Sequence, residues 1–150
     1  MKFVKAHALG NDFLLLDAAD VPKVPDRPAL TRALCERRRG IGADGAIFYS
    51  ARTDGAVMQL LNADGSRSEV SGNGVRCLAA ALAGRAHAPV GSSLTIHTDA
   101  GPKVLRLAGI DKIGIVTSDC GESVQESILI AIIAELRKRK RSTRICWQLR

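Results

Sequence analysis

The stretch Asn62-Ala-Asp-Gly-Ser66, followed closely by Ser71-Gly-Asn-Gly-Val-Arg-Cys77, decides the fold of this chain. The first part has the residues of a tight turn. From the second part onward, apolar residues recur at the i, i+3, i+4 and i+7 spacing of an amphipathic helix. They are Val75, Leu78, Ala79 and Leu82. Because serine is a preferred N-cap residue, the pattern predicts a helix that begins at Ser71 and runs to about Arg85.

The N-terminal end of this helix is a candidate anion site. The first N–H groups of a helix lack intrahelical acceptors, and they carry the positive end of the helix dipole. Gly72 and Gly74 would let a ligand approach the backbone closely. The residues by themselves leave two interpretations open, a carboxylate site and a plain helix cap formed by Ser71.

Short strands surround this helix in the sequence. Apolar runs and apolar–polar alternation predict them at residues 3–6, 13–16, 46–49, 57–61, 92–98 and 103–107. The turn Leu9-Gly-Asn-Asp12 joins the first two in a hairpin and places Asn11 at its mouth. Many short strands with two helices predict an α+β fold, a mostly antiparallel sheet around the central helix that begins at Ser71.

A first helix is predicted to begin near Pro28, because proline suits the first helical turn. Residues 30–34 then carry an apolar stripe. Arg37-Arg-Arg39 follows where cations favour a helix C-terminus, and Gly40 fits the position after the cap. We therefore interpret the three arginines as a helix end and a solvated face rather than as a phosphate site.

The composition bounds the class of protein. A length of 150 residues fits one domain, and a hydrophobic fraction of 46% suffices for a core. No two of the four cysteines have CxxC spacing, so we expect free thiols and no metal. The N-terminus lacks the apolar segment of a signal peptide, and the longest apolar run, residues 128–134, is too short to span a bilayer. We therefore expect a cytoplasmic protein without membrane contact.

The net charge of +7 has a basic run near its C-terminal end. Arg137-Lys-Arg-Lys-Arg141 and Arg144 could bind nucleic acid through phosphate contacts. Charge blocks are more often solvated tails, and residues that could stack on or read bases are scarce near this run. We therefore rank nucleic-acid binding last among the functions considered.

Four motifs occur in order over residues 1–108. They are Ala8-Leu-Gly-Asn-Asp-Phe13, Arg39-Gly-Ile-Gly-Ala-Asp-Gly45, the stretch from Asn62 to Cys77, and Thr98-Asp-Ala-Gly101. Together they resemble the N-terminal half of the diaminopimelate epimerase family. The resemblance implies one half of a two-domain fold with the active site in the cleft. Since it ends near residue 109, we expect an N-terminal domain, 1–109, and a divergent tail, 110–150, with a helix and a basic end.

The resemblance implies an isomerase that needs no cofactor and interconverts LL- and meso-diaminopimelate in lysine and peptidoglycan biosynthesis. In the family, one thiolate removes the α-proton and a second thiol, on the opposite face, delivers a proton. Carried over by position, Asn11 and Asn62 would bind the amino-acid substrate. The backbone of Gly72 and Asn73 would bind its α-carboxylate, and the catalytic position falls on Ser71.

Two departures from the family keep other hypotheses open. Ser71 stands where the family has its first catalytic cysteine, and a serine hydroxyl needs a partner base to remove a proton. Cys77 lies six residues further on, and we interpret it as a small buried hydrophobe. The family's second catalytic cysteine has only a faint echo at Cys120, so this chain is expected to be incomplete, through truncation, a frameshift or a genuinely divergent tail.

Three functions therefore rank ahead of nucleic-acid binding. The first is an epimerase chain with negligible activity by itself. The second is a non-catalytic remnant that binds carboxylates. The third is a relative of the proline racemases, a group in which some members use Ser or Thr on hydroxyprolines, as Ser71 would here. The exposed half of the cleft would be covered either by self-association into a homodimer or by residues 123–137.

Overall fold

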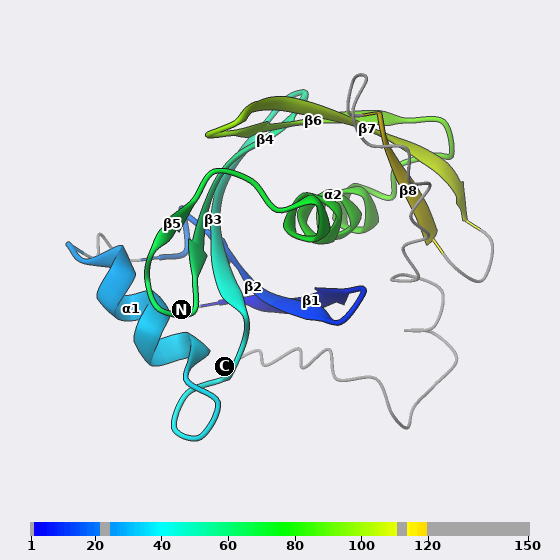
Figure 1. Cartoon of the computed structure of the whole chain (residues 1–150). Helices are drawn as coiled ribbons and strands as arrows, with labels where there is room; N and C mark the ends of the chain where they lie inside the picture. The colour runs from blue at the N-terminus through cyan, green and yellow to red at the C-terminus, as the bar shows by residue number, and fades with distance from the viewer. Residues whose placement is uncertain (1, 22–24, 111–113, 120–150) are drawn as a thin grey trace.

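The computed structural model describes residues 2–21, 25–110 and 114–119 of the chain. Within them, one curled eight-stranded sheet wraps around a central helix (Figure 1). The strands are β1 (Val4–Ala8), β2 (Asn11–Asp17), β3 (Gly45–Arg52), β4 (Gly55–Asn62), β5 (Arg67–Ser68), β6 (Ser93–Thr98), β7 (Gly101–Ile110) and β8 (Gly114–Asp119). The helices are α1 (Arg27–Cys35) and the central α2 (Gly72–Ala86). The predicted α+β class is confirmed.

Three hairpins with two-residue turns build most of the sheet. They pair β1 with β2, β3 with β4, and β6 with β7, and all three pairs are antiparallel. In the first turn, Leu9 and Gly10 both have positive φ, at 49° and 90°. Positive φ at both central residues is the geometry that matches the twist of a tight hairpin. The hairpin predicted between the first two strands is confirmed.

Two parallel pairings join these hairpins into one sheet. β2 pairs with β3 in the register of Phe13 with Gly45, and β4 pairs with β6 in the register of Gly55 with Thr95. Parallel neighbours require crossover connections, and these contain α1 and α2 respectively. The mostly antiparallel sheet was predicted, but the two parallel pairings were not.

Gly55 is required where β4 meets β6. Its φ is 151°, and a Cβ at this position would lie 2.1 Å from the carbonyl oxygen of Thr95. No flexible side chain could move to relieve that contact, because the obstructing atom belongs to the backbone. A glycine therefore permits the close parallel pairing here.

The core has two parts, one on each face of the sheet. On the inner face, α2 buries Val75 and Leu78 against a cluster that includes Leu15 and Ile47. On the outer face, α1 covers a second cluster that includes Leu14, Leu16, Phe48 and Cys35. Alternate residues of β2 thus enter both clusters. The apolar run 13–16 is therefore buried on both faces of the sheet.

The end of α1 differs from the sequence prediction. The helix ends at Cys35, and Glu36 caps it by donating its N–H to the carbonyl of Arg32. Arg37, Arg38 and Arg39 follow the helix, and Gly40 does not adopt the left-handed backbone of a terminal glycine. The three arginines therefore lie just beyond the last turn of α1 and not within it, while their exposure agrees with the solvated face that was predicted.

Beyond residue 110, the described part of the chain adds only β8, which pairs antiparallel with β7. The predicted helix at 123–137, the basic run and Cys120 lie outside the described residues. The division into 1–109 and 110–150 stays a prediction. Among the described helices, none is long and apolar enough to cross a membrane.

Candidate functional site

The site is built on the N-terminal end of α2. Ser71 has the extended backbone of an N-cap, and its Oγ accepts a hydrogen bond of 3.2 Å from the N–H of Gly74. The first helical bond runs from Val75 N–H to the Ser71 carbonyl, at 2.8 Å. The N–H groups of Gly72 and Asn73 have no recorded acceptor among the described residues. The predicted N-cap is confirmed, and two donors remain at the positive end of the helix.

The glycines at this helix end have different roles. Gly72 is exposed, and a Cβ there would meet only the Arg76 side chain, at 3.3 Å. Gly74 is buried, and its Cβ would lie 3.0 Å from Ile47 Cδ1. The second glycine therefore lets the helix end rest directly on β3, while the first leaves the backbone open on the solvent side.

The β1–β2 hairpin brings Asn11 to this helix end. The Nδ2 group of Asn73 donates to Oδ1 of Asn11 at 2.8 Å, across 62 positions of sequence. Asn11 in turn donates from Nδ2 to the Asp44 carboxylate, at 3.4 Å. Two residues proposed to bind substrate, Asn11 and Asn73, are thus in direct contact.

Asn62 lies at the same end of the sheet but has a different set of contacts. It ends β4 opposite Gly45, which itself pairs with Phe13 of β2. Its Nδ2 donates to Ser66 Oγ at 2.9 Å, and its backbone N–H donates to the Ser66 carbonyl. No recorded hydrogen bond joins Asn62 to Asn11 or to the helix end among the described residues. The structure therefore places Asn62 within its own turn, where one amide oxygen is left for other contacts.

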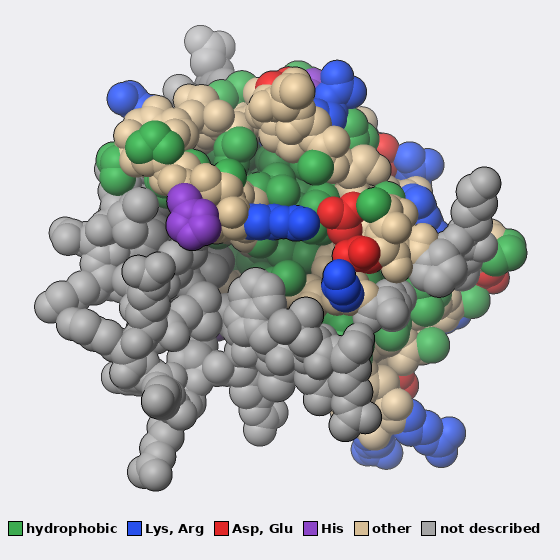
Figure 2. All heavy atoms as spheres, turned by 180° about the vertical axis from the view of Figure 1, so that it is seen from behind, with side chains coloured by type: hydrophobic (Ala, Val, Ile, Leu, Met, Phe, Trp, Pro, Cys, Tyr) green, Lys and Arg blue, Asp and Glu red, His purple; other side chains and the backbone are tan. Residues whose placement is uncertain are grey.

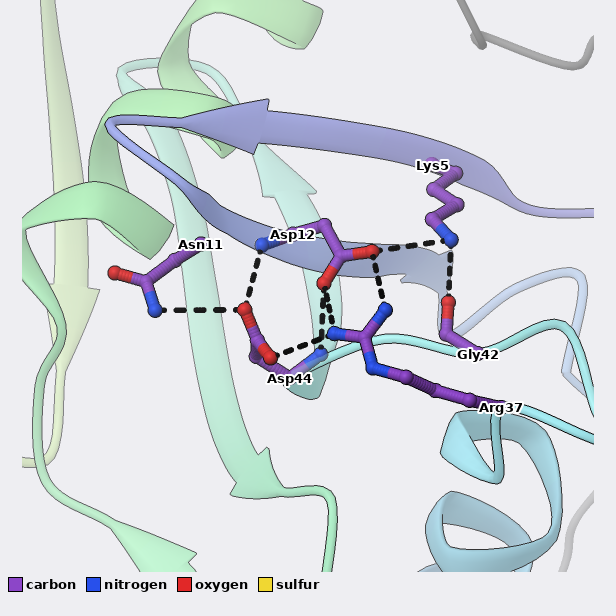
Figure 3. A network of polar contacts seen from close by, with 6 residues as sticks. All are labelled: Lys5, Asn11, Asp12, Arg37, Gly42 and Asp44. Carbon is purple, nitrogen blue, oxygen red and sulfur yellow. Dashed lines mark hydrogen bonds and ion pairs between the residues drawn. The ribbon is translucent and has the colours of Figure 1, made fainter.

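A charged network joins the β1–β2 hairpin to the start of β3 and to the segment after α1 (Figure 3). The sequence did not predict it. Asp12 accepts from Lys5 Nζ at 3.1 Å and from Arg37 Nη2 at 2.9 Å, and Arg37 Nη2 also lies 2.8 Å from Asp44 Oδ1. Lys5 also donates to the carbonyl of Gly42. Arg37 therefore joins two carboxylates from the starts of neighbouring strands, which is why it does not act as a helix-end charge.

The two carboxylates also bind each other's backbone. The N–H of Asp12 donates to Asp44 Oδ2 at 3.0 Å, and the N–H of Asp44 donates to Asp12 Oδ1 at 3.1 Å. This reciprocal arrangement fixes the start of β2 against the start of β3. In the sequence, both aspartates follow glycine-rich turns. Aspartate is common in turns for reasons of its own, so this position did not by itself indicate a charged network.

The network shifts the titration of Asp12. Burial by itself raises its pKa, but hydrogen bonds and charges from Arg37 and Lys5 outweigh that effect. They lower the pKa of Asp12 from 3.8 to about 2. The Asp12 carboxylate therefore stays charged at neutral pH, and the ion pairs on it persist.

The described part of the chain has no thiol at this helix end. Cys77 is fully buried in α2, and burial raises its pKa to about 12. Cys35 is buried under α1, and its pKa is raised to about 11, again mainly by burial. Thiols with such pKa values are poor bases and poor nucleophiles at neutral pH. The interpretation of Cys77 as a small buried hydrophobe is consistent with this geometry.

Ser71 has no base beside it among the described residues. Its Oγ is hydrogen-bonded to the Gly74 N–H, and no histidine, lysine or carboxylate side chain is recorded in contact with it. His7, on β1, is exposed and lies opposite Asp12 in the hairpin. Without a base, a serine hydroxyl can accept or donate a hydrogen bond but does not readily remove a proton from carbon.

One face of the molecule combines charge with apolar side chains. In the view from behind, acidic and basic side chains lie together near the middle of the face, beside hydrophobic ones (Figure 2). No group of three His, Cys, Asp or Glu side chains that could hold a metal ion occurs in residues 2–21, 25–110 or 114–119. The donors at the helix end are N–H groups, and these suit a carboxylate.

Comparisons with known proteins point to one family. The model of the family described as diaminopimelate epimerase matches residues 3–126. The chain is 42% identical to the diaminopimelate epimerase of Microcystis aeruginosa over 123 residues, which cover 79% of this chain and 42% of that protein. It is 41% identical to the chloroplastic diaminopimelate epimerase of Oryza sativa subsp. japonica, over 83% of this chain and 35% of that protein.

A solved structure shows the same fold at low sequence identity. A probable proline racemase from Agrobacterium radiobacter aligns with a TM-score of 0.58 and 21% identity, over 73% of this chain and 38% of that one. At this identity the likeness concerns the fold alone. In each of these comparisons, the chain spans less than half of the matched protein's length.

Proposed function

Because this chain belongs to the diaminopimelate epimerase family, we propose that it forms the N-terminal wall of an amino-acid epimerase site. In this proposal, the N–H groups of Gly72 and Asn73 bind the α-carboxylate of diaminopimelate. Asn11 and Asn62 contact the rest of the substrate, and Ser71 occupies the catalytic position. The reaction is the interconversion of LL- and meso-diaminopimelate without a cofactor.

The observation that carries the proposal is the contact between Asn11 and Asn73 at a helix end where, among the described residues, the N–H groups of Gly72 and Asn73 have no recorded acceptor. A carboxylate placed there would accept backbone donors and lie at the positive end of the helix dipole. The same interactions would stabilise the negative charge that develops when the α-proton leaves. The site thus offers binding and charge stabilisation from one side of the α-carbon.

The proposal separates binding from turnover. Ser71 has no base beside it among the described residues, and the matched relatives are more than twice as long as the matched region. We therefore expect the 150-residue chain to bind diaminopimelate with negligible exchange of its α-hydrogen. The alternative of a non-catalytic carboxylate-binding protein predicts the same two results for the 150-residue chain, binding of diaminopimelate and negligible exchange. The two hypotheses differ only for a longer protein that includes this chain.

The test is a titration of the ¹⁵N-labelled 150-residue chain with meso-diaminopimelate, followed by NMR. The amide signals of Gly72 and Asn73 should move most, because their N–H groups would meet the carboxylate. 1,5-Diaminopentane, which has the same amines without carboxylates, should leave them in place. Unchanged signals with diaminopimelate at millimolar concentration would refute the proposed site.

A second arm tests turnover and substrate class. Incubation with diaminopimelate in D₂O should give negligible deuterium at the α-carbon. Exchange that Ser71→Ala abolishes would contradict this expectation and make Ser71 an acid–base residue. Tighter binding of hydroxyproline than of diaminopimelate at Gly72 and Asn73 would instead favour the proline racemase-like alternative.

The place in metabolism belongs to the same proposal. A diaminopimelate epimerase serves lysine and peptidoglycan biosynthesis, and we propose this role in the cytoplasm. The rice relative is chloroplastic, so the location depends on the host cell. Rescue of a diaminopimelate-epimerase-deficient bacterium by a gene that includes this chain would support the role, and failure of a well-expressed full-length gene would count against it.

A further inference from the structure

A row of hydrogen bonds crosses the site from a buried arginine to a carboxylate. Arg76 Nη1 donates to Asn73 Oδ1 at 3.3 Å, and Asn73 Nδ2 donates to Asn11 Oδ1 at 2.8 Å. Asn11 Nδ2 then donates to Asp44 Oδ2 at 3.4 Å. Figure 3 shows the last of these bonds, with the Asn11 amide nitrogen facing Asp44. The row therefore links α2, the β1–β2 hairpin and the start of β3.

The two ends of the row determine its direction. An arginine side chain can only donate hydrogen bonds, and a carboxylate at neutral pH can only accept them. Between them, each asparagine amide must accept with its oxygen on the Arg76 side and donate with its nitrogen on the Asp44 side. The orientation of Asn73 and Asn11 follows from the chemistry of the end groups, although the two amide orientations have nearly the same shape.

Both ends of the row are held firmly. Arg76 is only 5% exposed, although its charged group lies in the second turn of α2. Asp44 accepts from the N–H of Asp12 at 3.0 Å and pairs with Arg37 at 2.8 Å, so its carboxylate has little freedom to rotate. Fixed ends can transmit a preferred orientation to the exposed amide of Asn11.

The fixed direction leaves donors for a ligand. Each amide nitrogen carries two hydrogens, and the row uses one of them on Asn73 and one on Asn11. For the other, no acceptor is recorded among the described residues. A bound carboxylate accepts only, so it would meet N–H groups in this orientation and repelling oxygens in the reversed one.

We propose that Arg76 and Asp44 are positioning residues, which orient the amides of Asn73 and Asn11 so that a free N–H of each can donate to a bound carboxylate. The proposal rests on the proposed function, because that function places the carboxylate at the end of α2. Neither residue needs to touch the substrate. Arg76 acts through Asn73, and Asp44 acts through Asn11.

The first arm of the test needs no ligand. Asp44→Asn replaces the acceptor at the end of the row by a group that can also donate, so Asn11 loses its fixed acceptor while Arg76 still holds Asn73. The side-chain NH₂ signals of Asn11 should lose their dispersion in the ¹⁵N spectrum of the 150-residue chain, and those of Asn73 should shift less. Asp54→Asn is the matched control, because Asp54 pairs with Arg52 in the exposed turn at the opposite end of β3. It should leave both signals unchanged.

The second arm measures the dissociation constant for meso-diaminopimelate. Asp44→Asn and Asn11→Ala should each raise it by roughly tenfold, the order expected for a lost hydrogen bond to a charged group. In the Asn11→Ala background, Asp44→Asn should add nothing, because Asp44 acts through Asn11. A purely structural role of Asp44 would lower affinity equally in both backgrounds, and that result would overturn the proposal.

Arg76 is tested with a conservative pair. Arg76→Lys keeps a group that only donates and should retain the Asn73 signal, whereas Arg76→Met should lose it. If the methionine variant does not fold, the Asp44 variants still decide the question. Unchanged NH₂ signals in Asp44→Asn would refute the proposed row whatever the ligand does. If the unmodified chain does not bind diaminopimelate, the proposed function fails, while the ligand-free spectra still report on the orientation.

Discussion

Replacing Asp12 by asparagine should destabilise the protein in a pH-dependent way. The Asp12 carboxylate accepts from Lys5, from both terminal nitrogens of Arg37 and from the backbone N–H of Asp44. An asparagine at this position removes the charge and puts an NH₂ group among these donors. The ion pairs that join β1, β2 and the segment after α1 would be lost together.

The size of the effect follows from the pKa of Asp12. A carboxyl group whose pKa falls from 3.8 to about 2 on folding contributes about 2 kcal/mol at neutral pH. The Asp12 side chain is 18% exposed and its partner Arg37 is 58% exposed, so solvent screening reduces the contribution. We therefore expect Asp12→Asn to lower the free energy of unfolding by about 1 kcal/mol at pH 7.

The pH dependence has a definite sign. Because folding lowers the pKa, the stabilisation is fully present above about pH 5. It is lost as the pH falls through 3.8 toward 2, where the folded protein also takes up the proton. The unfolding free energies of the two proteins should therefore converge toward pH 2.

Urea unfolding followed by circular dichroism at several pH values between 7 and 2.5 measures this difference. Asp54→Asn serves as the control, since the Asp54 carboxylate lies 3.6 Å from Arg52 in an exposed ion pair and should matter by less than about 1 kcal/mol. A gap between wild type and Asp12→Asn that is equally large at pH 7 and pH 2.5 would refute the electrostatic reasoning. So would the absence of any gap at pH 7.

Three further predictions concern the helices and the sheet. Cys35 and Cys77 should react with iodoacetamide at pH 8 at least about a hundredfold more slowly than free thiols, because burial raises their pKa values to about 11 and about 12. Peptide mapping that finds either cysteine of the native protein modified at the rate of a free thiol would contradict this. Ser71→Ala should lower the unfolding free energy by about 1 kcal/mol through loss of the N-cap, and Ser71→Gly by only a few tenths; equal losses would show that the cap bond does not matter. Gly55→Ala should have a thermal midpoint well below that of Gly91→Ala. Both glycines have positive φ, but of the two only a Cβ at Gly55 would clash with backbone atoms, those of Thr95. Similar midpoints would mean that β4 and β6 separate easily.

Local sequence signals were sufficient for much of the fold. The turn at Leu9 and Gly10, the apolar run of β2 and the periodicity after Ser71 each depend on residues close in sequence. Such signals predicted the first hairpin and α2. The parallel pairing of β4 with β6 depends instead on which strands meet after a long crossover, and no short pattern specifies that.

The site was predictable only in part, for the same reason. The resemblance to the family indicated Asn11 and Asn73, and Ser71 was recognisable as a cap. That Asn11 and Asn73 touch, and that Arg37 pairs with Asp12 and Asp44, follows from the side-by-side position of β2, β3 and α2. Arg37 was misassigned because its neighbours Arg38 and Arg39 made it look like part of a charged helix end, whereas its partners are distant in sequence.

The position of α2 inside the curled sheet has a consequence for how the chain folds. The helix is part of the crossover between β4 and β6. Those two strands therefore cannot pair until the whole crossover, α2 included, has reached its place against the sheet. The three hairpins can form early, since their strands are joined by two-residue turns, whereas the parallel closures involve residues far apart in the chain. Formation of the inner core and closure of the sheet should then be a single late event. We expect stopped-flow refolding to show one dominant phase, in which the helical and core signals appear together and which Gly55→Ala slows more than a change in the first hairpin does.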